Sequence, residues 1–244
     1  MVGAETFRGP KMRIVDAKMA ASFAAVLLLI ILSYSFLDLP VTFYCKGLNK
    51  NIVDFFGIVT EFGISTWYLV GSFALFLFYR FFRRRPIYAH RALFLFSSIV
   101  FSGIIANIIK VIIGRYRPEM FFEKGLYGVN FLNFSFFNFS HGLTSFPSGH
   151  TATTFSLAWA LSLFFPRTRI PLFCFAVMVG ASRVIITSHY LSDALGGAYV
   201  GIMSVLFLKE IIGSLDRKFS WGFKLQKEDK NEDLGNSGKS PGGR

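Results

Sequence analysis

The feature that most constrains the fold is a series of six apolar stretches, each close to the length needed to cross a membrane. They lie near residues 19–38, 65–82, 92–114, 149–165, 170–187 and 191–213. A helix needs about 20 mostly apolar residues to span a bilayer core. The composition agrees, because 53% of the residues are hydrophobic and only 16% are charged. The sequence therefore predicts an all-α polytopic membrane protein with six transmembrane helices in residues 1–218.

Both ends of the chain are polar. Four basic residues before the first apolar stretch (Arg8, Lys11, Arg13 and Lys18) resemble the start of a signal peptide. Residues 33–40 lack a small-residue cleavage pattern, so we interpret the stretch as a retained anchor. Residues 219–244 are rich in charged residues, Gly and Ser, which predicts a disordered tail.

The net charge of +12 is distributed in a way that indicates a membrane orientation. Basic clusters precede the first stretch and follow the second, fourth and sixth. With six crossings all of these clusters fall on one side, which is the positive-inside pattern and places both termini in the cytoplasm. Basic juxtamembrane segments also attract anionic lipid headgroups. The charge therefore indicates a lipid bilayer as partner and gives little support to nucleic-acid binding.

Two segments on the opposite, external side are rich in apolar residues. Within residues 39–64, an i, i+3, i+4, i+7 series predicts a short amphipathic helix, lying on the membrane surface or packed on the bundle. Its members are Ile52, Phe55, Phe56, Val59 and Phe62. The loop 118–147 interleaves aromatic residues with Gly, Asn and Ser, and we expect either a lid beside a site or an interfacial anchor. Alternation over residues 134–139 also fits a short strand.

Three residue sets fall at this external edge. They are Lys110 with Arg117-Pro118, the run Pro147-Ser148-Gly149-His150, and Ser182-Arg183 with His189 and Asp193. Hydropathy and charge alone place the end of the third span, the start of the fourth, the end of the fifth and the start of the sixth on this side. The topology therefore brings all three sets to one interface.

The first set supplies two cations. Lys110 and Arg117 are seven residues apart, so on a helix they share a face about 10 Å apart along the axis. Charges near the membrane interior are costly unless an anion or carboxylate meets them, although both side chains could also extend to the interface. Pro118 disfavours a helical Arg117 and should end the span.

The second set reads as a helix start. Pro147 suits a first turn, and Ser148 and Gly149 allow a close backbone approach, so the free N–H groups favour a phosphate oxygen. Alone, this run could be a simple helix cap. His150 would lie beside the phosphate, where it could protonate a leaving alkoxide.

The third set pairs a histidine with a carboxylate. His189 and Asp193 are four residues apart, so the carboxylate can hold one ring nitrogen and leave the other free to attack. Such a pair can also be purely structural. Arg183 would supply a bidentate grip on phosphate oxygens.

In this order, K-x6-R-P, P-S-G-H and S-R-x5-H-x3-D resemble the three-part signature of the type 2 phosphatidic acid phosphatase family. The resemblance implies that His189 is the nucleophile that forms a phosphohistidine, that Asp193 orients it, and that His150 is the acid and then the base. It implies that the phosphoryl oxygens are held by Lys110, Arg117, Arg183, Ser148 and the Gly149 amide. It implies no metal and no cofactor. Ser182 belongs to the signature, but its role is open and it could only pack.

We expect a phosphatase acting on a phosphorylated membrane lipid at the outer leaflet. The candidate substrates are phosphatidic acid, phosphatidylglycerophosphate, undecaprenyl pyrophosphate and lipid A. Transfer from the same phosphohistidine to an acceptor lipid is the alternative, and a non-enzymatic anion transporter is a third reading. A bacterial inner membrane with a periplasmic site fits, as does an endoplasmic reticulum with a lumenal one. His90 receives no role, and His141 could touch a headgroup.

Overall fold

The computed structural model describes residues 17–130 and 141–219 of the chain. The chain divides into two units, and the described residues up to 208 belong to one of them. In the second unit, the described residues 209–219 continue a helix. The predicted tail 219–244 lies outside the described residues except for Phe219, which ends a helix, and the alternating residues 134–139 lie outside them as well.

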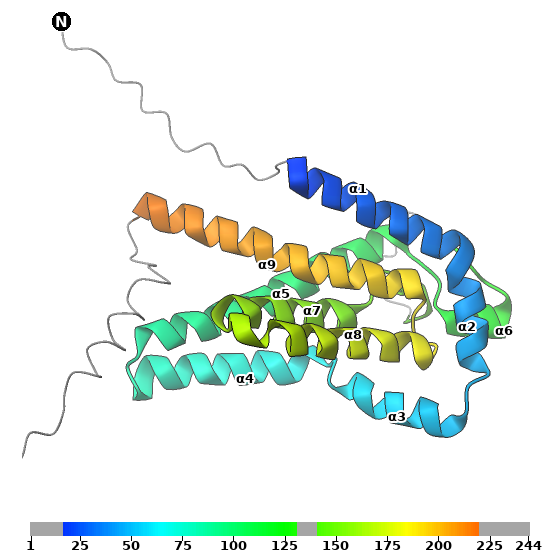
Figure 1. Cartoon of the computed structure of the whole chain (residues 1–244), viewed down its shortest axis with the longest axis horizontal. Coiled ribbons are helices and arrows are strands. Elements are labelled where there is room, and N and C mark those ends of the chain that lie inside the picture. Colours follow the sequence, from blue (N-terminus) through cyan, green and yellow to red (C-terminus); the bar gives the residue numbers. More distant parts are fainter. Residues whose placement is uncertain (1–16, 131–140, 220–244) are drawn as a thin grey trace, which may run out of the picture. The chain divides into compact units, whose positions relative to one another are not determined.

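Helices make up almost all of the described chain (Figure 1). They are α1 Ala17–Leu32, α2 Asp38–Lys46, α3 Lys50–Glu61, α4 Ser65–Leu77, α5 Pro86–Ile113, α6 Pro118–Lys124, α7 Gly149–Phe164, α8 Arg169–Ile185 and α9 Leu191–Phe219. π-helical turns at Ser33–Leu37 and Phe78–Phe82 extend α1 and α4. The described residues contain no strand, only a bridge between Arg115 and Val129.

Five helical segments among the described residues are long and apolar enough to cross a membrane. They are Met19–Lys46, Lys50–Phe82, Pro86–Ile113, Pro166–Ile185 and Leu191–Gly213. The predicted fourth span corresponds to α7, which has only 16 residues. The all-helical membrane protein is therefore confirmed, whereas the predicted fourth span, and with it the total of six spans, remains a prediction.

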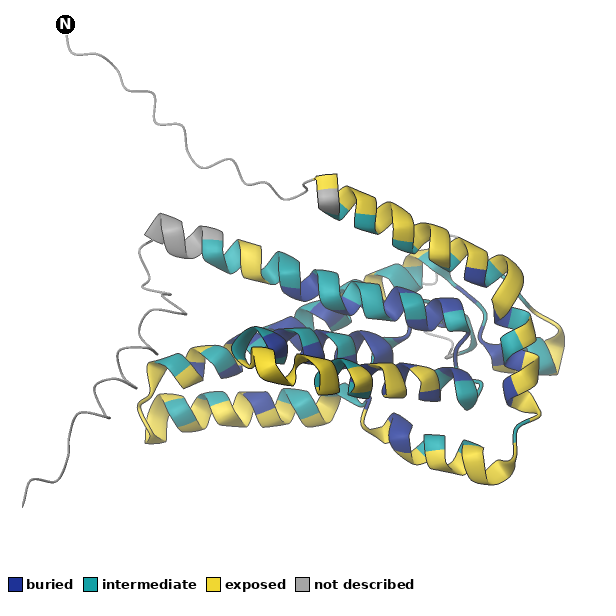
Figure 2. Ribbon diagram, in the orientation of Figure 1, coloured by how far each residue is buried: buried dark blue, intermediate teal, exposed yellow. Residues whose placement is uncertain are grey.

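The outer helices are largely exposed, whereas one central helix is largely buried (Figure 2). Helices α1 and α4 expose large apolar side chains such as Leu28, Ile31 and Trp67. Helix α7 instead packs against α5 and α8 and buries mainly small residues, including Ala152, Ala158 and Ala160. Small residues let membrane helices approach closely, so α7 is suited to the middle of the bundle.

The contact between α7 and α9 depends on two glycines. A Cβ on Gly201 would lie 2.4 Å from the carbonyl oxygen of Ala152, and one on Gly197 would lie 2.5 Å from that of Ser148. Both neighbours are backbone atoms, which cannot rotate away. Glycine at these two positions therefore fixes how closely α9 approaches the start of α7.

The external segments contain more helix than predicted. Residues 39–64 form two helices, because α2 continues from the first span before α3 begins. Helix α3 packs against α8; Val59 is buried, whereas Ile52, Phe55 and Phe62 are exposed. In the loop 118–147, the first residues form α6 and residues 131–140 lie outside the described part of the chain. The position of these segments relative to the membrane surface remains a prediction.

Candidate active site

Four helix ends meet at the predicted site. Lys110 lies in the last turn of α5, Arg183 in the last turn of α8, and Asp193 in the first turn of α9. The backbone N–H of Ser148, just before α7, donates to the carbonyl oxygen of Asp193 at 3.0 Å. The Lys110 Nζ lies 3.8 Å from the position of a Cβ on Gly149. The structure thus brings residues from all three predicted sets together.

Three positively charged side chains lie at this site, and two of them have hydrogen-bond donors without a partner among the described residues. The charges of Lys110, Arg117 and Arg183 all act on His150. Arg183 Nη1 donates to Thr60 Oγ1 at 2.8 Å, and Arg117 makes long contacts of 3.5 Å to the carbonyls of Thr144 and Ser188. The Nε atoms of both arginines are buried without a hydrogen-bond partner among the described residues. Buried cations with unsatisfied donors are suited to holding an anion.

The start of α7 has the predicted form with one difference. The helix begins at Gly149, with Ser148 at the capping position and Pro147 one residue before it, outside the first turn. The first helical hydrogen bond runs from Ala152 N to Ser148 O at 3.0 Å. The N–H groups of Gly149, His150 and Thr151 therefore precede the first helical hydrogen bond and can bind phosphate oxygens.

His150 lies against the connection between α3 and α4. A Cβ on Gly63 would lie 2.7 Å from the Cβ of His150 and 2.6 Å from its Cδ2. These distances are shorter than real carbon contacts, so only glycine fits at this point. Gly63 was not predicted from the sequence, and it restricts the position of the proposed acid.

His189 is almost fully buried and faces Asp193. Its Nδ1 lies 3.5 Å from Asp193 Oδ2, longer than an ordinary hydrogen bond. Burial lowers the pKa of His189 from 6.5 to about 3, against the opposing effect of the Asp193 carboxylate. The ring is therefore neutral at pH 7. With Nδ1 toward the carboxylate, Nε2 is the nitrogen that can attack.

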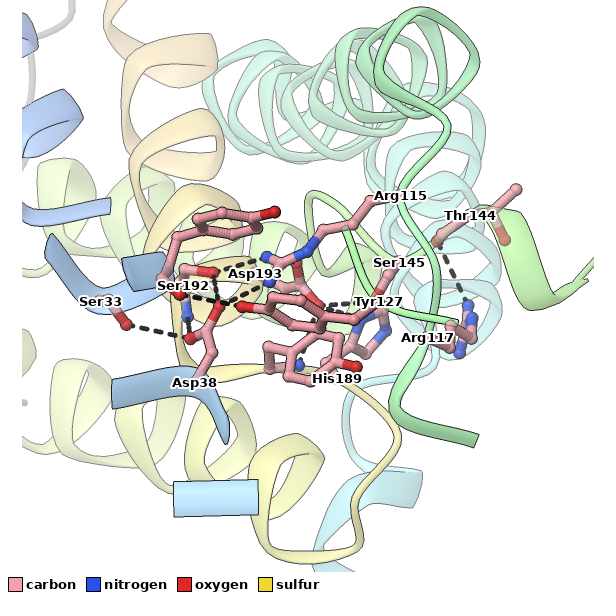
Figure 3. Close-up of polar contacts among 12 residues, drawn as sticks. Ser33, Asp38, Arg115, Arg117, Tyr127, Thr144, Ser145, His189, Ser192 and Asp193 are labelled. Carbon is pink, nitrogen blue, oxygen red and sulfur yellow. Dashed lines mark hydrogen bonds and ion pairs between the residues drawn. The ribbon is translucent and has the colours of Figure 1, made fainter. Parts of the chain in front are cut away.

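The carboxylate of Asp193 belongs to a buried network that the motifs did not predict (Figure 3). Its other partners are the side chains of Arg115 and Ser145 and the N–H of Tyr190, at 2.5, 2.5 and 2.8 Å. Arg115 in turn donates to Asp38, at the start of α2. The sequence did contain a signal, because a carboxylate within an apolar segment, such as Asp38, requires a buried partner.

A polar cavity of about 270 Å³ lies beside the site. Its lining residues are Lys46, Arg117, Glu119, Phe122, Glu123, Ile186, Thr187 and Ser188. Glu119 and Glu123 are one turn apart on α6, so they share a face of that helix. The cavity could hold a polar group attached to a phosphate on Arg117.

The remaining predicted residues have less specific surroundings. Ser182 is buried, and its hydroxyl donates to Val179 O within α8 at 2.6 Å, which agrees with a packing role. The side chain of His141 lies outside the described residues. In the described part of the chain, no three His, Cys, Asp or Glu residues are grouped to hold a metal ion.

Comparison with known proteins supplies relatives. A lipid A 1-phosphatase from Rhizobium etli is 39% identical over 114 residues, which cover 46% of this chain and 47% of that protein. Another, from Rhizobium johnstonii, is 33% identical over 154 residues, covering 59% and 61%. The matches thus span about half to three fifths of these relatives. The crystal structure of Aquifex aeolicus LpxE aligns with a TM-score of 0.52 and 26% identity, covering 71% of this chain and 95% of that one.

A family profile covers the whole predicted constellation. Residues 91–216, more than half of the chain, match the profile of the PAP2 superfamily. This segment contains all three predicted sets, from Lys110 to Asp193. The resemblance stated from the motifs is therefore confirmed: the chain belongs to the PAP2 superfamily.

Proposed function

We propose that this protein is an integral membrane lipid phosphatase that hydrolyses a phosphomonoester or pyrophosphate of a lipid through a phosphohistidine on His189. One observation carries the proposal. His189 is buried and neutral, and its Nδ1 faces a carboxylate. The positive charges of Arg117 and Arg183 act on it, and the Nε donors of these arginines have no hydrogen-bond partner among the described residues. This arrangement combines a nucleophile with an anion-binding site.

In the first step, His189 Nε2 attacks phosphorus while the ester P–O bond breaks. Lys110, Arg117, Arg183 and the start of α7 hold the phosphoryl oxygens and stabilise the charge that develops on them. His150, in its protonated form, gives its proton to the leaving oxygen. The Nδ1 proton stays on His189, and Asp193 balances the positive charge that the ring acquires.

In the second step, water attacks the phosphohistidine. His150, now neutral, accepts a proton from the water as the new P–O bond forms and the N–P bond breaks. Inorganic phosphate leaves, and His189 returns to its neutral form. No step requires a metal, because protein cations supply the positive charge.

The apolar helices and the relatives support the proposed substrate class. Two relatives are named lipid A 1-phosphatases, so a lipid A type substrate is the first to test. The polar cavity next to Arg117 is suited to the sugar or glycerol part of the lipid, with Glu119 and Glu123 accepting hydrogen bonds from hydroxyl groups. We place the site at the periplasmic face of a bacterial inner membrane, with both termini cytoplasmic, from the positive-inside pattern.

The test is phosphate release by detergent-purified protein. The panel contains lipid A, phosphatidic acid, phosphatidylglycerophosphate and undecaprenyl pyrophosphate. We expect release from at least one lipid, its loss in His189→Ala and its retention in His90→Ala, a histidine outside the site. Vanadate, which mimics the pentacoordinate phosphorus, should inhibit, and a chelator should not.

Other outcomes separate the alternatives. Release that persists in His189→Ala would refute the proposed nucleophile. Phosphate that appears only on an added acceptor lipid would identify a phosphotransferase. Anion flux without any phosphate transfer would identify a transporter.

A further inference from the structure

The catalytic carboxylate is connected to a second buried carboxylate through one guanidinium. Arg115 is 2% exposed and lies between α5 and α6. Its Nη1 donates to Asp193 Oδ1 at 2.5 Å, and its Nη2 donates to Asp38 Oδ2 at 2.6 Å (Figure 3). Asp38 and Asp193 are both completely buried. One cation is therefore shared by two anions, which gives this cluster a net charge of −1.

Asp38 is held in place by groups away from the phosphate site. Its Oδ1 accepts from Ser192 N at 2.9 Å and from Ser33 Oγ at 3.1 Å. Its Oδ2 accepts from Ser192 Oγ at 2.5 Å in addition to Arg115. The Ser192 N–H belongs to the first turn of α9, where a carboxylate also meets the positive end of the helix dipole. Asp38 therefore links the first span to the helix that carries Asp193.

Arg115 and Asp38 act on Asp193 in opposite directions. Arg115 makes the electrostatic potential of Asp193 at His189 less negative. Asp38 neutralises part of the charge of the same guanidinium, so it makes that potential more negative again. The rings of Tyr34 and Tyr190 lie 4.9 and 4.5 Å from the guanidinium carbon and help to keep it out of water. In a buried site such charges are weakly screened, so each affects the histidine.

We propose that Asp38, acting through Arg115, is a positioning residue for the nucleophile: it keeps the cluster around Asp193 net negative and so favours the positively charged phosphohistidine of His189. The inference rests on the proposed phosphohistidine mechanism. It goes beyond the motifs, because neither Asp38 nor Arg115 belongs to the predicted site.

The two chemical steps respond differently to this charge. When the N–P bond forms, the His189 ring gains positive charge, and when that bond breaks, the ring loses it. A less negative cluster therefore slows phosphorylation of the enzyme and does not slow hydrolysis of the phosphohistidine. A purely structural defect that displaces His189 would slow both steps.

The experiment measures phosphoenzyme with Asp38→Asn, which removes the charge but keeps the shape. Purified protein is mixed with a radiolabelled substrate found in the lipid panel, and covalent label on the protein is followed by rapid quenching. We expect phosphorylation to slow by about tenfold, hydrolysis to be unchanged or faster, and the steady-state phosphoenzyme to fall. KM should change little.

The matched control is Ser192→Ala. This substitution removes the two hydrogen bonds that the Ser192 hydroxyl makes with Arg115 and Asp38. It leaves the net charge of the network unchanged. We expect a lower melting temperature but an unchanged share of phosphoenzyme. If Ser192→Ala lowers that share as much as Asp38→Asn, the cluster is only structural and the inference is wrong.

A double variant separates the effect of the net charge from the loss of the Asp38 contacts. Asp38→Asn with Arg115→Gln removes one charge of each sign and restores a net charge of −1. We expect its share of phosphoenzyme to return toward that of the unmodified protein, and a share as low as that of Asp38→Asn would overturn the inference. Unmodified protein that hydrolyses lipid without any phosphoenzyme would instead refute the proposed mechanism, and the inference with it.

Discussion

At neutral pH the buried ring of His189 carries no charge, because burial lowers its pKa to about 3. The direction of this pKa shift decides the charge of the ring. A lowered pKa means that the ring loses its proton at a lower pH, so above about pH 4 the lone pair of this proposed nucleophile is free. An exposed histidine would be half protonated near pH 6.5.

We therefore expect His189 to remain neutral from about pH 4 to pH 8. The measurement is the imidazole NMR signal of His189 in labelled protein, assigned by its absence in His189→Gln. Its chemical shift should stay nearly constant over this range. A titration with a midpoint near 6.5 that disappears in His189→Gln would contradict the prediction.

Gly63 provides a second test at the scale of one residue. In Gly63→Ala, the new methyl group would push on the Cβ of His150 and displace the proposed acid. We expect kcat to fall by about 10- to 100-fold, most for substrates with poor leaving groups. The control is Gly57→Ala on α3, where a Cβ would meet no atom within 4 Å. Equal activity of the two variants would show that His150 does not need this fixed position.

Residues in the motifs could be predicted from the sequence, and their partners could not. His150, His189 and the three cations follow from ordered spacings whose chemistry is recognisable. Asp38 pairs with Arg115 across 77 residues, and such a pairing depends on how the first span packs. The sequence indicated only that a carboxylate near a membrane span needs a partner.

At the scale of elements, the helix ends determine the site. The predicted second span, 65–82, corresponds to α4 with its π-helical turn, because apolar residues fill the whole segment. The third begins at Pro86, six residues before the predicted 92, because a helix can continue through polar interfacial residues that hydropathy excludes. Helix α7 is shorter than a usual membrane span. Its small residues allow the close packing of α5 and α8, and the sequence does not identify these neighbours.

The packing of α9 on α7 should depend strongly on Gly201. An added Cβ would lie 2.4 Å from Ala152 O, so Gly201→Ala must separate the two helices that carry Asp193 and His150. We expect the melting temperature to fall by roughly 5 °C or more, with a loss of activity.

The matched control is Gly103→Ala within α5, where a Cβ would have open space. Thermal unfolding in detergent measures both variants. If Gly103→Ala is destabilised as much as Gly201→Ala, the close approach of α9 to α7 is not the reason.

At the scale of the whole molecule, sidedness is the property that the sequence predicts most directly. Basic clusters alternate with the apolar stretches, and the same alternation places the three residue sets opposite them. The number of crossings is harder to predict, because a 16-residue helix surrounded by protein does not need the length of a lipid-facing span.

Labelling from one side of the membrane tests this orientation. In a background without Cys45 and Cys174, Lys124→Cys on α6 and Arg83→Cys before α5 each introduce one exposed thiol. We expect a membrane-impermeant maleimide to label Lys124→Cys in intact spheroplasts, because α6 adjoins the site. Arg83→Cys should react only after the membrane is opened, because its basic cluster is predicted to face the cytoplasm. The reverse pattern would place the site in the cytoplasm, and the lipid substrate would then have to come from the inner leaflet.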